Sequence, residues 1–271
     1  MPELPEVETA RRGIAPHVQG RRVAAVIVRD RRLRWPIPPA LSRELPGQTI
    51  VNVTRRAKYL LFHTAGGTLI IHLGMSGSLR VVPCATPPAK WDHLDIALDN
   101  GKCLRLRDPR RFGAALWTRA DPARHALLKD LGPEPFGPDF TPEYLYAITR
   151  GRKLKLRDLL LNTRVVAGVG NIYANEALFA AGLRPRRAAG QTTRADCARL
   201  VTAVRETLKR AIAAGGTTLR DFRNADGLPG YFQQTLMVYG RTGEPCRQCG
   251  APVRAVRLGQ RSAFYCPRCQ R

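Results

Sequence analysis

Four cysteines near the C-terminus, in Cys246-Arg247-Gln248-Cys249 and Cys266-Pro267-Arg268-Cys269, decide how the end of this 271-residue chain folds. Their spacing, C-x2-C-x16-C-x2-C, supplies two pairs of thiolates of the kind that close a tetrahedral shell around zinc. Disulfides are the alternative, but the N-terminus does not read as a signal peptide, so we expect a reducing compartment. The segment is too short for a hydrophobic core, and metal binding would supply most of its folding energy. We therefore predict a zinc β-hairpin with one structural Zn²⁺, bound by Cys246, Cys249, Cys266 and Cys269.

The charge of the chain indicates its partner. Lys and Arg number 45 against 21 Asp and Glu, which gives a formal net charge of +24. Such an excess on a folded protein is typical of nucleic-acid binding, although an arginine-rich proteome also raises the count. A hydrophobic content of 44% excludes wholesale disorder, and no apolar run is long enough to cross a membrane. We expect a nucleic-acid-binding protein that has no membrane partner.

From about residue 20 to residue 120 the hydrophobic pattern has mostly a period of two. Short apolar or alternating runs bounded by turn residues occur at 23–28, 59–62, 68–73, 94–98 and 103–107. The sequence Asp99-Asn100-Gly101-Lys102 between the last two runs is typical of a two-residue hairpin turn. Many short strands without helices between them predict an antiparallel sandwich or barrel. An N-terminal helix is predicted before it, because Pro5 precedes an apolar stripe at helical spacing.

A change of period after residue 131 predicts a second, helical region. Residues 131–138 contain three prolines and two glycines, a composition typical of a hinge. Helical periodicity follows at 144–149, 154–161, 172–181 and 193–214, and Gly215-Gly216 would end the last helix. We thus predict a multidomain α+β protein. Its parts are a helix and β-sandwich domain at 1–130, a hinge and the start of the helical domain at 131–150, a helical DNA-binding domain at 151–225, and a zinc-finger domain at 226–271.

The N-terminus carries residues suited to covalent chemistry on a sugar. Removal of Met1, expected before a proline, would expose the secondary amine of Pro2, which titrates close to neutral pH. Its neutral form can attack a sugar C1′ atom and form an iminium ion, and Glu3 could move protons in that reaction. The alternative use of Glu3 and Glu6 is to stabilise the start of a helix. The N-terminus alone leaves both open.

Six motifs occur in one order along the chain. They are Pro2-Glu3-Leu4-Pro5-Glu6-Val7-Glu8, Lys58, His72-Leu73-Gly74-Met75-Ser76-Gly77, Asp108-Pro109-Arg110-Arg111-Phe112-Gly113, Val169-Gly170-Asn171-Ile172-Tyr173-Ala174-Asn175-Glu176 and the zinc knuckles. Together they resemble the bacterial formamidopyrimidine-DNA glycosylase family over essentially the whole chain. The opening and the segment between Gly215 and Tyr231 are similar to this branch rather than to the endonuclease VIII branch.

The resemblance implies a base-excision-repair enzyme. Its substrate would be damaged double-stranded DNA, from which it removes 8-oxoguanine and formamidopyrimidines before nicking the strand by β,δ-elimination. The same resemblance implies a monomer without an organic cofactor, located in the bacterial cytoplasm and associated with the nucleoid when acting on DNA. The runner-up is a DNA-binding module without catalysis. Pro2, Glu3 and Lys58 distinguish the two, because a pure binder has no need of them together.

The resemblance also assigns catalytic roles. Pro2 would be the nucleophile that forms the Schiff base, with Glu3 as general acid and base. Glu6 would support the site, while Lys58 would donate a proton around β-elimination and contact phosphate. Arg261 would hold the phosphates that flank the lesion and take part in δ-elimination. A plain surface lysine is the alternative for Lys58.

Further residues would bind DNA. Met75, Arg110 and Phe112 would fill the space left by the extruded base, although Met75 and Phe112 by type alone would be core residues. Phosphate contacts are expected from Asn171 in a helix-two-turn-helix hairpin and from Arg152 and Lys153. His72 and His93 are either phosphate ligands or hydrogen-bonded interior histidines. The predicted DNA-contact set is completed by Trp91 and Arg111.

A loop and three departures from the family pattern remain. Residues 217–230 would close over the extruded 8-oxoguanine, or would merely connect the helical region to the zinc hairpin. Arg157 stands where lysine is common, Asn162 where aspartate is common, and Trp91 where histidine is common. An arginine in place of lysine keeps the charge and changes the geometry, so the phosphate contact at Arg157 is what the departure puts in question.

Overall fold

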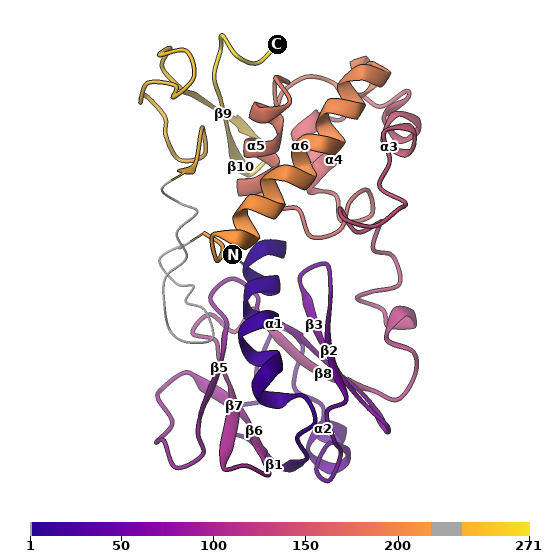
Figure 1. Cartoon of the computed structure of the whole chain (residues 1–271), viewed down its shortest axis with the longest axis vertical. Coiled ribbons are helices and arrows are strands. Elements are labelled where there is room, and N and C mark those ends of the chain that lie inside the picture. Colours follow the sequence, from indigo (N-terminus) through magenta and orange to yellow (C-terminus); the bar gives the residue numbers. More distant parts are fainter. Residues whose placement is uncertain (1, 218–234) are drawn as a thin grey trace. The chain divides into compact units, whose positions relative to one another are not determined.

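The computed structural model describes residues 2–217 and 235–271 (Figure 1). The chain forms two compact units, residues 1–129 with 214–233, and residues 130–213 with 234–271. The loop predicted to close over the damaged base therefore lies outside the described residues, apart from Thr217. In the part of the chain that is described, no helix combines the length and the apolar character needed to cross a bilayer.

The first unit begins with the predicted N-terminal helix, α1, which spans Leu4–Val18. Glu3 is its N-cap residue and Pro5 lies in its first turn, where a missing N–H costs no hydrogen bond. The side chains of Glu3 and Glu6 each accept the backbone N–H of the other, which makes a capping box. The apolar stripe of α1, from Val7 to Val18, faces the sandwich core.

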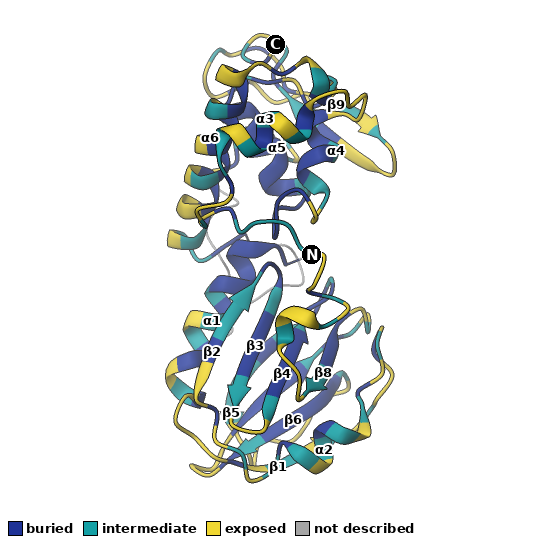
Figure 2. Ribbon diagram, turned by 90° about the vertical axis from the view of Figure 1, so that its right-hand side faces the viewer, coloured by how far each residue is buried: buried dark blue, intermediate teal, exposed yellow. Residues whose placement is uncertain are grey.

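Two antiparallel sheets of four strands confirm the predicted sandwich (Figure 2). One has the order β1-β6-β7-β5 and the other the order β2-β3-β4-β8. The elements are β1 (Val23–Val28), α2 (Pro39–Glu44), β2 (Asn52–Arg56), β3 (Tyr59–Thr64), β4 (Gly67–His72), β5 (Ser78–Pro83), β6 (Asp92–Leu98), β7 (Lys102–Arg107), β8 (Ala114–Thr118) and the 3-10 turn η1 (Pro122–Arg124). The predicted turn at 99–102 joins β6 to β7, with Gly101 at a φ of 74°.

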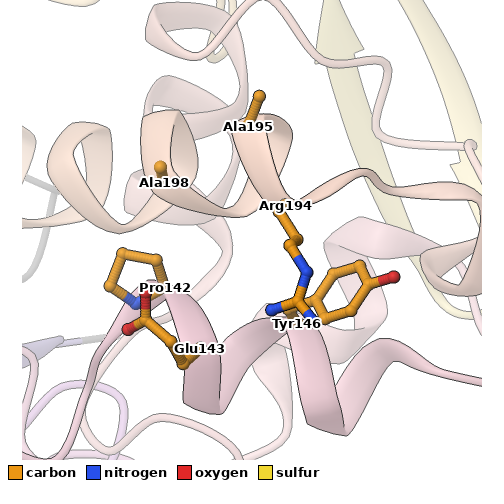
Figure 3. Close-up of a pocket in the computed structure, with 6 residues that line it drawn as sticks. All are labelled: Pro142, Glu143, Tyr146, Arg194, Ala195 and Ala198. Carbon is orange, nitrogen blue, oxygen red and sulfur yellow. The ribbon is translucent and has the colours of Figure 1, made fainter.

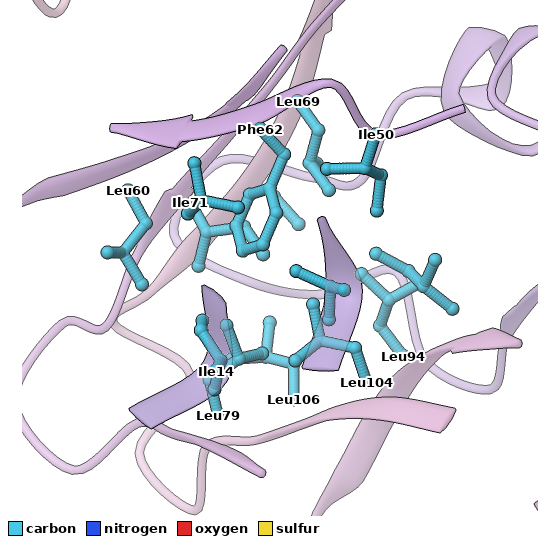
Figure 4. Packing of buried hydrophobic residues seen from close by; sticks show 14 of the residues in the cluster. Ile14, Ile50, Leu60, Phe62, Leu69, Ile71, Leu79, Leu94, Leu104 and Leu106 are labelled. Atoms are coloured by element: carbon cyan, nitrogen blue, oxygen red, sulfur yellow. The ribbon is translucent and has the colours of Figure 1, made fainter. Parts of the chain in front are cut away.

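Apolar side chains from the two sheets meet between them and form the core. Figure 4 shows Phe62, Leu69 and Ile71 of one sheet opposite Leu94, Leu104 and Leu106 of the other. All six are fully or almost fully buried. Burial of this much apolar surface fixes the strand register, because a slip by one residue would turn each side chain to solvent.

The second unit is helical, as predicted, and ends in a β-hairpin. Its elements are α3 (Pro142–Thr149), α4 (Leu156–Leu161), α5 (Asn171–Ala180), the 3-10 turn η2 (Ala189–Gln191), α6 (Arg194–Ala213), β9 (Arg254–Leu258) and β10 (Arg261–Tyr265). Helix α6 packs against both α3 and α5. Thr193 and Asp196 cap its start reciprocally, through bonds of 2.9 and 3.1 Å between side chain and backbone.

Helix α4 is shorter than its periodicity predicts. We expect it from residue 154, but it begins at Leu156 because Leu154 and Lys155 pair with the segment before η2. The N–H of Ala189 donates to the carbonyl of Leu154, and Lys155 forms an antiparallel bridge with Ala188. Backbone groups bonded in this extended pairing are not available to a first helical turn.

Candidate functional site

The start of α1 holds the predicted nucleophile and its acid in a buried position. Pro2 is buried, and Glu3 is 3% exposed. Glu6 is fully buried and uses both carboxylate oxygens, with Oε2 accepting the N–H of Glu3 at 2.8 Å and Oε1 that of Thr217 at 2.8 Å. Glu6 therefore fixes the helix start and the chain that follows Gly216.

Lys58 lies in the tight connection between β2 and β3. The preceding residue, Ala57, has a φ of 53°, the left-handed region that few non-glycine residues adopt. Arg55 Nη1 donates to the carbonyl of Ala57 at 2.9 Å and so braces this turn. Lys58 itself is only 9% exposed. Lys58 therefore lies in a turn of defined backbone conformation and is largely buried, whereas a plain surface lysine would be exposed.

His72 ends β4 beside Lys58. Its ring lies tilted against that of Tyr59, with the ring centres 4.8 Å apart, and its Nδ1 accepts the N–H of Gly74 at 3.1 Å. Burial, together with the charges of Lys58 and Arg34, lowers the pKa of His72 to about 4. At neutral pH the imidazole is therefore neutral, and because Nδ1 accepts, its proton is on Nε2. An Nε2–H donor on a ring that feels the charges of Lys58 and Arg34 suits an anionic oxygen.

Arg34 is a cation near this group that the sequence alone did not single out. It is exposed, and its guanidinium lies 4.9 Å from the centre of the Trp35 ring. Its charge acts on both His72 and Tyr59. The neighbouring Trp35 forms a bridge with Ala114, which pairs in turn with His72. The only sequence signal for Arg34 is the run of basic residues around it. Several other basic runs in this chain look the same, so this run does not single out Arg34.

The loops at 73–77 and 108–113 are joined by one buried carboxylate. Asp108 is fully buried; its Oδ1 accepts the hydroxyl of Ser76 at 2.8 Å and its Oδ2 accepts the N–H of Gly113 at 2.7 Å. The two backbones also touch, since a Cβ at Gly74 would lie 2.4 Å from the carbonyl carbon of Phe112. Asp108 was not among the predicted site residues, although it lies within a quoted motif.

These loops present the predicted wedge residues. Phe112 is 42% exposed and Met75 is half-buried, so Phe112 is not the core residue that its type alone suggested. The exposed Arg110 has its guanidinium 5.0 Å from the centre of the Phe112 ring. An exposed aromatic ring with a cation beside it can stack with a base.

Three other predicted contacts are engaged within the protein. Arg111 has a φ of 57° and pairs with Asp30 at 2.8 Å. His93 is 2% exposed, and its Nε2 donates to the carbonyl of Asp108 at 2.8 Å, the interior alternative left open for it. Trp91 is half-buried, and the ammonium of Lys90 lies 4.9 Å from its ring centre. The structure places His93 under the loop that carries the wedge.

In the second unit, Asn171 starts α5 and contacts the zinc hairpin. Its Nδ2 donates to the carbonyl of Ser262 at 3.1 Å, and its Oδ1 accepts from Arg157 Nη1 at 3.1 Å. Arg157 is 1% exposed, and its Nη2 donates to the carbonyl of Leu258 at 2.7 Å. One planar guanidinium thus spans two acceptors, which a lysine cannot do in the same way. Arg157 in this chain therefore braces the hairpin.

The other cations that we predict to contact DNA in this unit face solvent. Arg152 and Lys153 are exposed in the segment before α4, and Arg261 is exposed at the first position of β10. Asn175 supports that strand, because its Oδ1 accepts the N–H of Phe264 at 2.7 Å. This bond between the Asn175 side chain and the backbone of β10 fixes the strand that begins with Arg261.

The four predicted zinc ligands come together. Their Sγ atoms all lie within 4.8 Å of one another, with 3.9 Å between Cys246 and Cys269 and 3.4 Å between Cys249 and Cys266. Tetrahedral zinc with Zn–S distances of about 2.3 Å requires sulfur atoms roughly 3.8 Å apart. None of the four forms a disulfide. The donor set fits one zinc ion, and the alternative of disulfide pairing is excluded.

Glu176 fastens the chain that enters the zinc finger. It is 4% exposed on α5, and its carboxylate accepts three consecutive backbone N–H groups, those of Met237, Val238 and Tyr239, at 2.8, 3.0 and 2.9 Å. Burial raises its pKa, and the three N–H groups oppose that rise. Glu176 is the last residue of a motif quoted above, but the sequence did not indicate this role.

A shallow pocket lies between α3 and the start of α6, apart from these residues (Figure 3). It has a volume of about 300 Å³ and is lined by Pro142, Glu143, Tyr146, Arg194, Ala195 and Ala198. The guanidinium groups of Arg150 and Arg194 lie 4.0 and 4.4 Å from the centre of the Tyr146 ring. None of its lining residues belongs to the predicted site.

Comparison with known proteins agrees with this architecture in all parts of the chain. Residues 1–115 match the formamidopyrimidine-DNA glycosylase N-terminal domain, residues 131–223 its H2TH domain, and residues 243–271 the zinc finger found in FPG and IleRS. The chain is 59% identical over 271 residues to the formamidopyrimidine-DNA glycosylases of Thioalkalivibrio sulfidiphilus and Stutzerimonas stutzeri, with full coverage of both chains. This chain belongs to the formamidopyrimidine-DNA glycosylase family.

Solved structures of the family share the fold. The MutM (Fpg) protein from Thermus thermophilus is 40% identical with a TM-score of 0.89, covering 99% of this chain and 98% of that one. A Lactococcus lactis Fpg variant in complex with DNA containing Fapy-dG is 33% identical with a TM-score of 0.92 and full coverage. A MutM complex with DNA containing carbocyclic 8-oxo-G is 34% identical with a TM-score of 0.91. The predicted fold class and the structural zinc site are thereby confirmed.

Proposed function

We propose that this chain is a DNA-repair glycosylase with AP-lyase activity that removes oxidised purines from double-stranded DNA. The observation that carries the proposal is the start of α1, where Pro2 lies buried next to a buried Glu3. Family membership and the damaged-DNA complexes of its relatives support the substrate class. Because the relatives are bacterial, we also propose that the enzyme is cytoplasmic. We further propose that it acts as a monomer without an organic cofactor.

The reaction is proposed to proceed through the amine of Pro2, once Met1 is removed. Its lone pair forms a bond to C1′, the glycosidic bond breaks, and the base leaves with that bond's electron pair and takes up the proton that the Pro2 nitrogen gives up. Glu3 donates a proton to the sugar O4′ as the ring opens, which gives the iminium ion. Loss of a C2′ proton then expels the 3′ phosphate, and a second elimination expels the 5′ phosphate. Water finally hydrolyses the iminium bond and regenerates Pro2.

The other residues bind and position the DNA in this proposal. Lys58, with the Nε2–H of His72 and the guanidinium of Arg34, would contact backbone phosphate in the first unit. Asn171, Arg152, Lys153 and Arg261 would do so in the second. Met75, Arg110 and Phe112 would enter the duplex where the base is extruded. His93, Arg111 and Trp91 would shape the loop that carries the wedge.

Borohydride trapping tests the function. Processed protein with an 8-oxoguanine·cytosine duplex should give a covalent protein–DNA adduct, because reduction of the iminium ion makes its bond permanent. Pro2→Gly should reduce the adduct sharply. An unchanged adduct yield in protein with a blocked N-terminal amine would exclude Pro2. DNA binding with no trapping by the intact protein would instead favour a binding module without catalysis.

A further inference from the structure

A buried carboxylate on α1 gathers three arginines. Glu8 is 8% exposed, and its oxygens accept from Arg11 at 2.9 and 3.1 Å, from Arg12 Nε at 2.8 Å and from Arg55 Nε at 3.3 Å. Arg11 and Arg12 belong to the same helix as Glu8. Arg55 belongs to β2, and Arg11 also reaches that strand, since its Nη1 donates to the carbonyl of Val53 at 3.3 Å, so two of the three arginines link this helix to β2.

Arg55 continues the link into the turn that carries Lys58. While Nε binds Glu8, Nη1 donates to the carbonyl of Ala57 at 2.9 Å. Ala57 is the residue with left-handed backbone, which needs support from its surroundings. The Arg55 side chain is only 11% exposed, which leaves little of it accessible to DNA. The chain of contacts runs Glu8, Arg55, Ala57, Lys58.

This chain of contacts connects two parts of the proposed catalytic group, the start of α1 and the turn that carries Lys58. Both parts belong to the first unit. Helix α1 begins at the capping box of Glu3 and Glu6, one turn before Glu8. The turn at Ala57 fixes where the Lys58 backbone leaves β2. The Glu8–Arg55 bridge connects the helix to the backbone of the residue before Lys58, and small misplacements of a catalytic group are costly.

We propose that Glu8 and Arg55 are positioning residues that hold Lys58 in register with the catalytic start of α1. The proposal rests on the function proposed above, in which Lys58 assists strand cleavage. Neither residue touches substrate; both act through the Ala57 turn. The bridge also survives over the working pH range. Burial opposes ionisation of Glu8, but hydrogen bonds from Arg11 and Arg12 lower its pKa to about 2.

A double-mutant cycle between Arg55 and Lys58 tests the proposal. The measurement is the single-turnover rate of strand cleavage at a preformed abasic site, with saturating protein. Arg55→Met, which keeps the apolar stem, should slow cleavage by about tenfold to hundredfold, the cost of a displacement near 1 Å. In a Lys58→Met background the same substitution should change the rate less than about twofold, because no ammonium remains to be positioned.

Two variants control for folding and for charge. Arg12→Met removes another partner of Glu8, but Arg12 is 60% exposed and does not contact the turn, so the rate should stay the same. Arg55→Lys keeps the charge but cannot reach both acceptors, so its rate should lie between wild type and Arg55→Met. Circular dichroism and the thermal midpoint show whether each variant is folded.

The outcomes separate the two proposals. Equal losses from Arg55→Met in both backgrounds would overturn positioning through Lys58. Full restoration of the rate by Arg55→Lys would also overturn it, because charge alone would then be sufficient. A Lys58→Met protein that cleaves at the wild-type rate would instead overturn the role of Lys58 in the proposed function, and the positioning proposal with it.

Discussion

Replacement of Glu176 by Gln should release the chain that enters the zinc finger from α5. In the wild type, Oε1 accepts the N–H groups of Val238 and Tyr239, and Oε2 accepts that of Met237. An amide keeps one oxygen and puts an NH₂ group where the other was, so one N–H then faces a donor. The substitution therefore removes one hydrogen bond and weakens two without changing side-chain size.

The magnitude follows from these three bonds. A hydrogen bond to a charged group contributes about 1.5–3 kcal/mol, and a buried donor left unsatisfied costs about 1–3 kcal/mol more. Their sum gives about 2.5–6 kcal/mol for undocking this segment, or about two to four powers of ten in the docking equilibrium at 1.36 kcal/mol per tenfold. This is a local equilibrium, so the β-sandwich should keep its own stability.

Hydrogen exchange of the amides of residues 237–239 measures this equilibrium. Their protection should fall by about two to four powers of ten in Glu176→Gln, and zinc transfer to a chelator should become faster. Glu206→Gln is the matched control, since it makes the same chemical change on the exposed side of α6. Unchanged protection of the three amides in a folded Glu176→Gln protein would refute the reasoning.

Three further predictions concern the first unit. The pKa of His72 is about 4 in the folded protein against 6.5 in the unfolded chain. Its contribution to the free energy of unfolding is therefore present above pH 6.5 and is lost as the pH falls toward 4. Urea unfolding should show this loss in the wild type and a smaller loss in His72→Gln. Asp95→Asn should cost about 3–5 kcal/mol in the same assay, because Arg105, 2% exposed, would lose the partner that binds it twice at 2.8 Å; a cost below about 1 kcal/mol would contradict this. Phe112→Ala should change stability by less than about 1 kcal/mol, since the ring is 42% exposed, yet slow 8-oxoguanine excision more than about tenfold; equal excision rates would remove Phe112 from the wedge.

Patterns that are local in sequence were the ones that could be predicted. The hairpin turn at 99–102 and the two cysteine knuckles each depend on residues a few positions apart, and both formed as expected. Periods of two and of 3.6 residues report which faces are buried, so the sandwich and the helices could also be predicted. The predicted start of α4 was wrong because backbone pairing with residues near 188 competes with the first helical turn. Those residues are distant in sequence from α4, so its own periodicity could not reveal them.

Side-chain contacts between distant segments could not be predicted in this way. Glu8 and Arg55 are 47 residues apart, and Arg157 and Leu258 are 101 residues apart. No spacing rule relates such residues, because the fold alone brings them together. Residue type left His93 open between a phosphate ligand and an interior histidine, and the fold places its buried ring in a hydrogen bond with the Asp108 carbonyl. A chemical type shows what a residue can do, and the fold decides which partner it has.

The second unit shows why the zinc finger depends on α5 as well as on its metal. The small apolar cluster of the finger includes Phe179 of α5 beside Cys246 and Cys266, so part of its core belongs to that helix. Asn171, Asn175 and Glu176 of the same helix bind Ser262, Phe264 and the 237–239 segment. Zinc closes the knuckles, but these bonds orient the hairpin. Arg261 is the first residue of β10. Helix α5, whose Asn171 was predicted to hold phosphate, therefore also fixes the position of the Arg261 backbone. Arg157 extends the same bracing to Leu258, on the other side of the turn, and this gives the departure from lysine a structural reason in this chain.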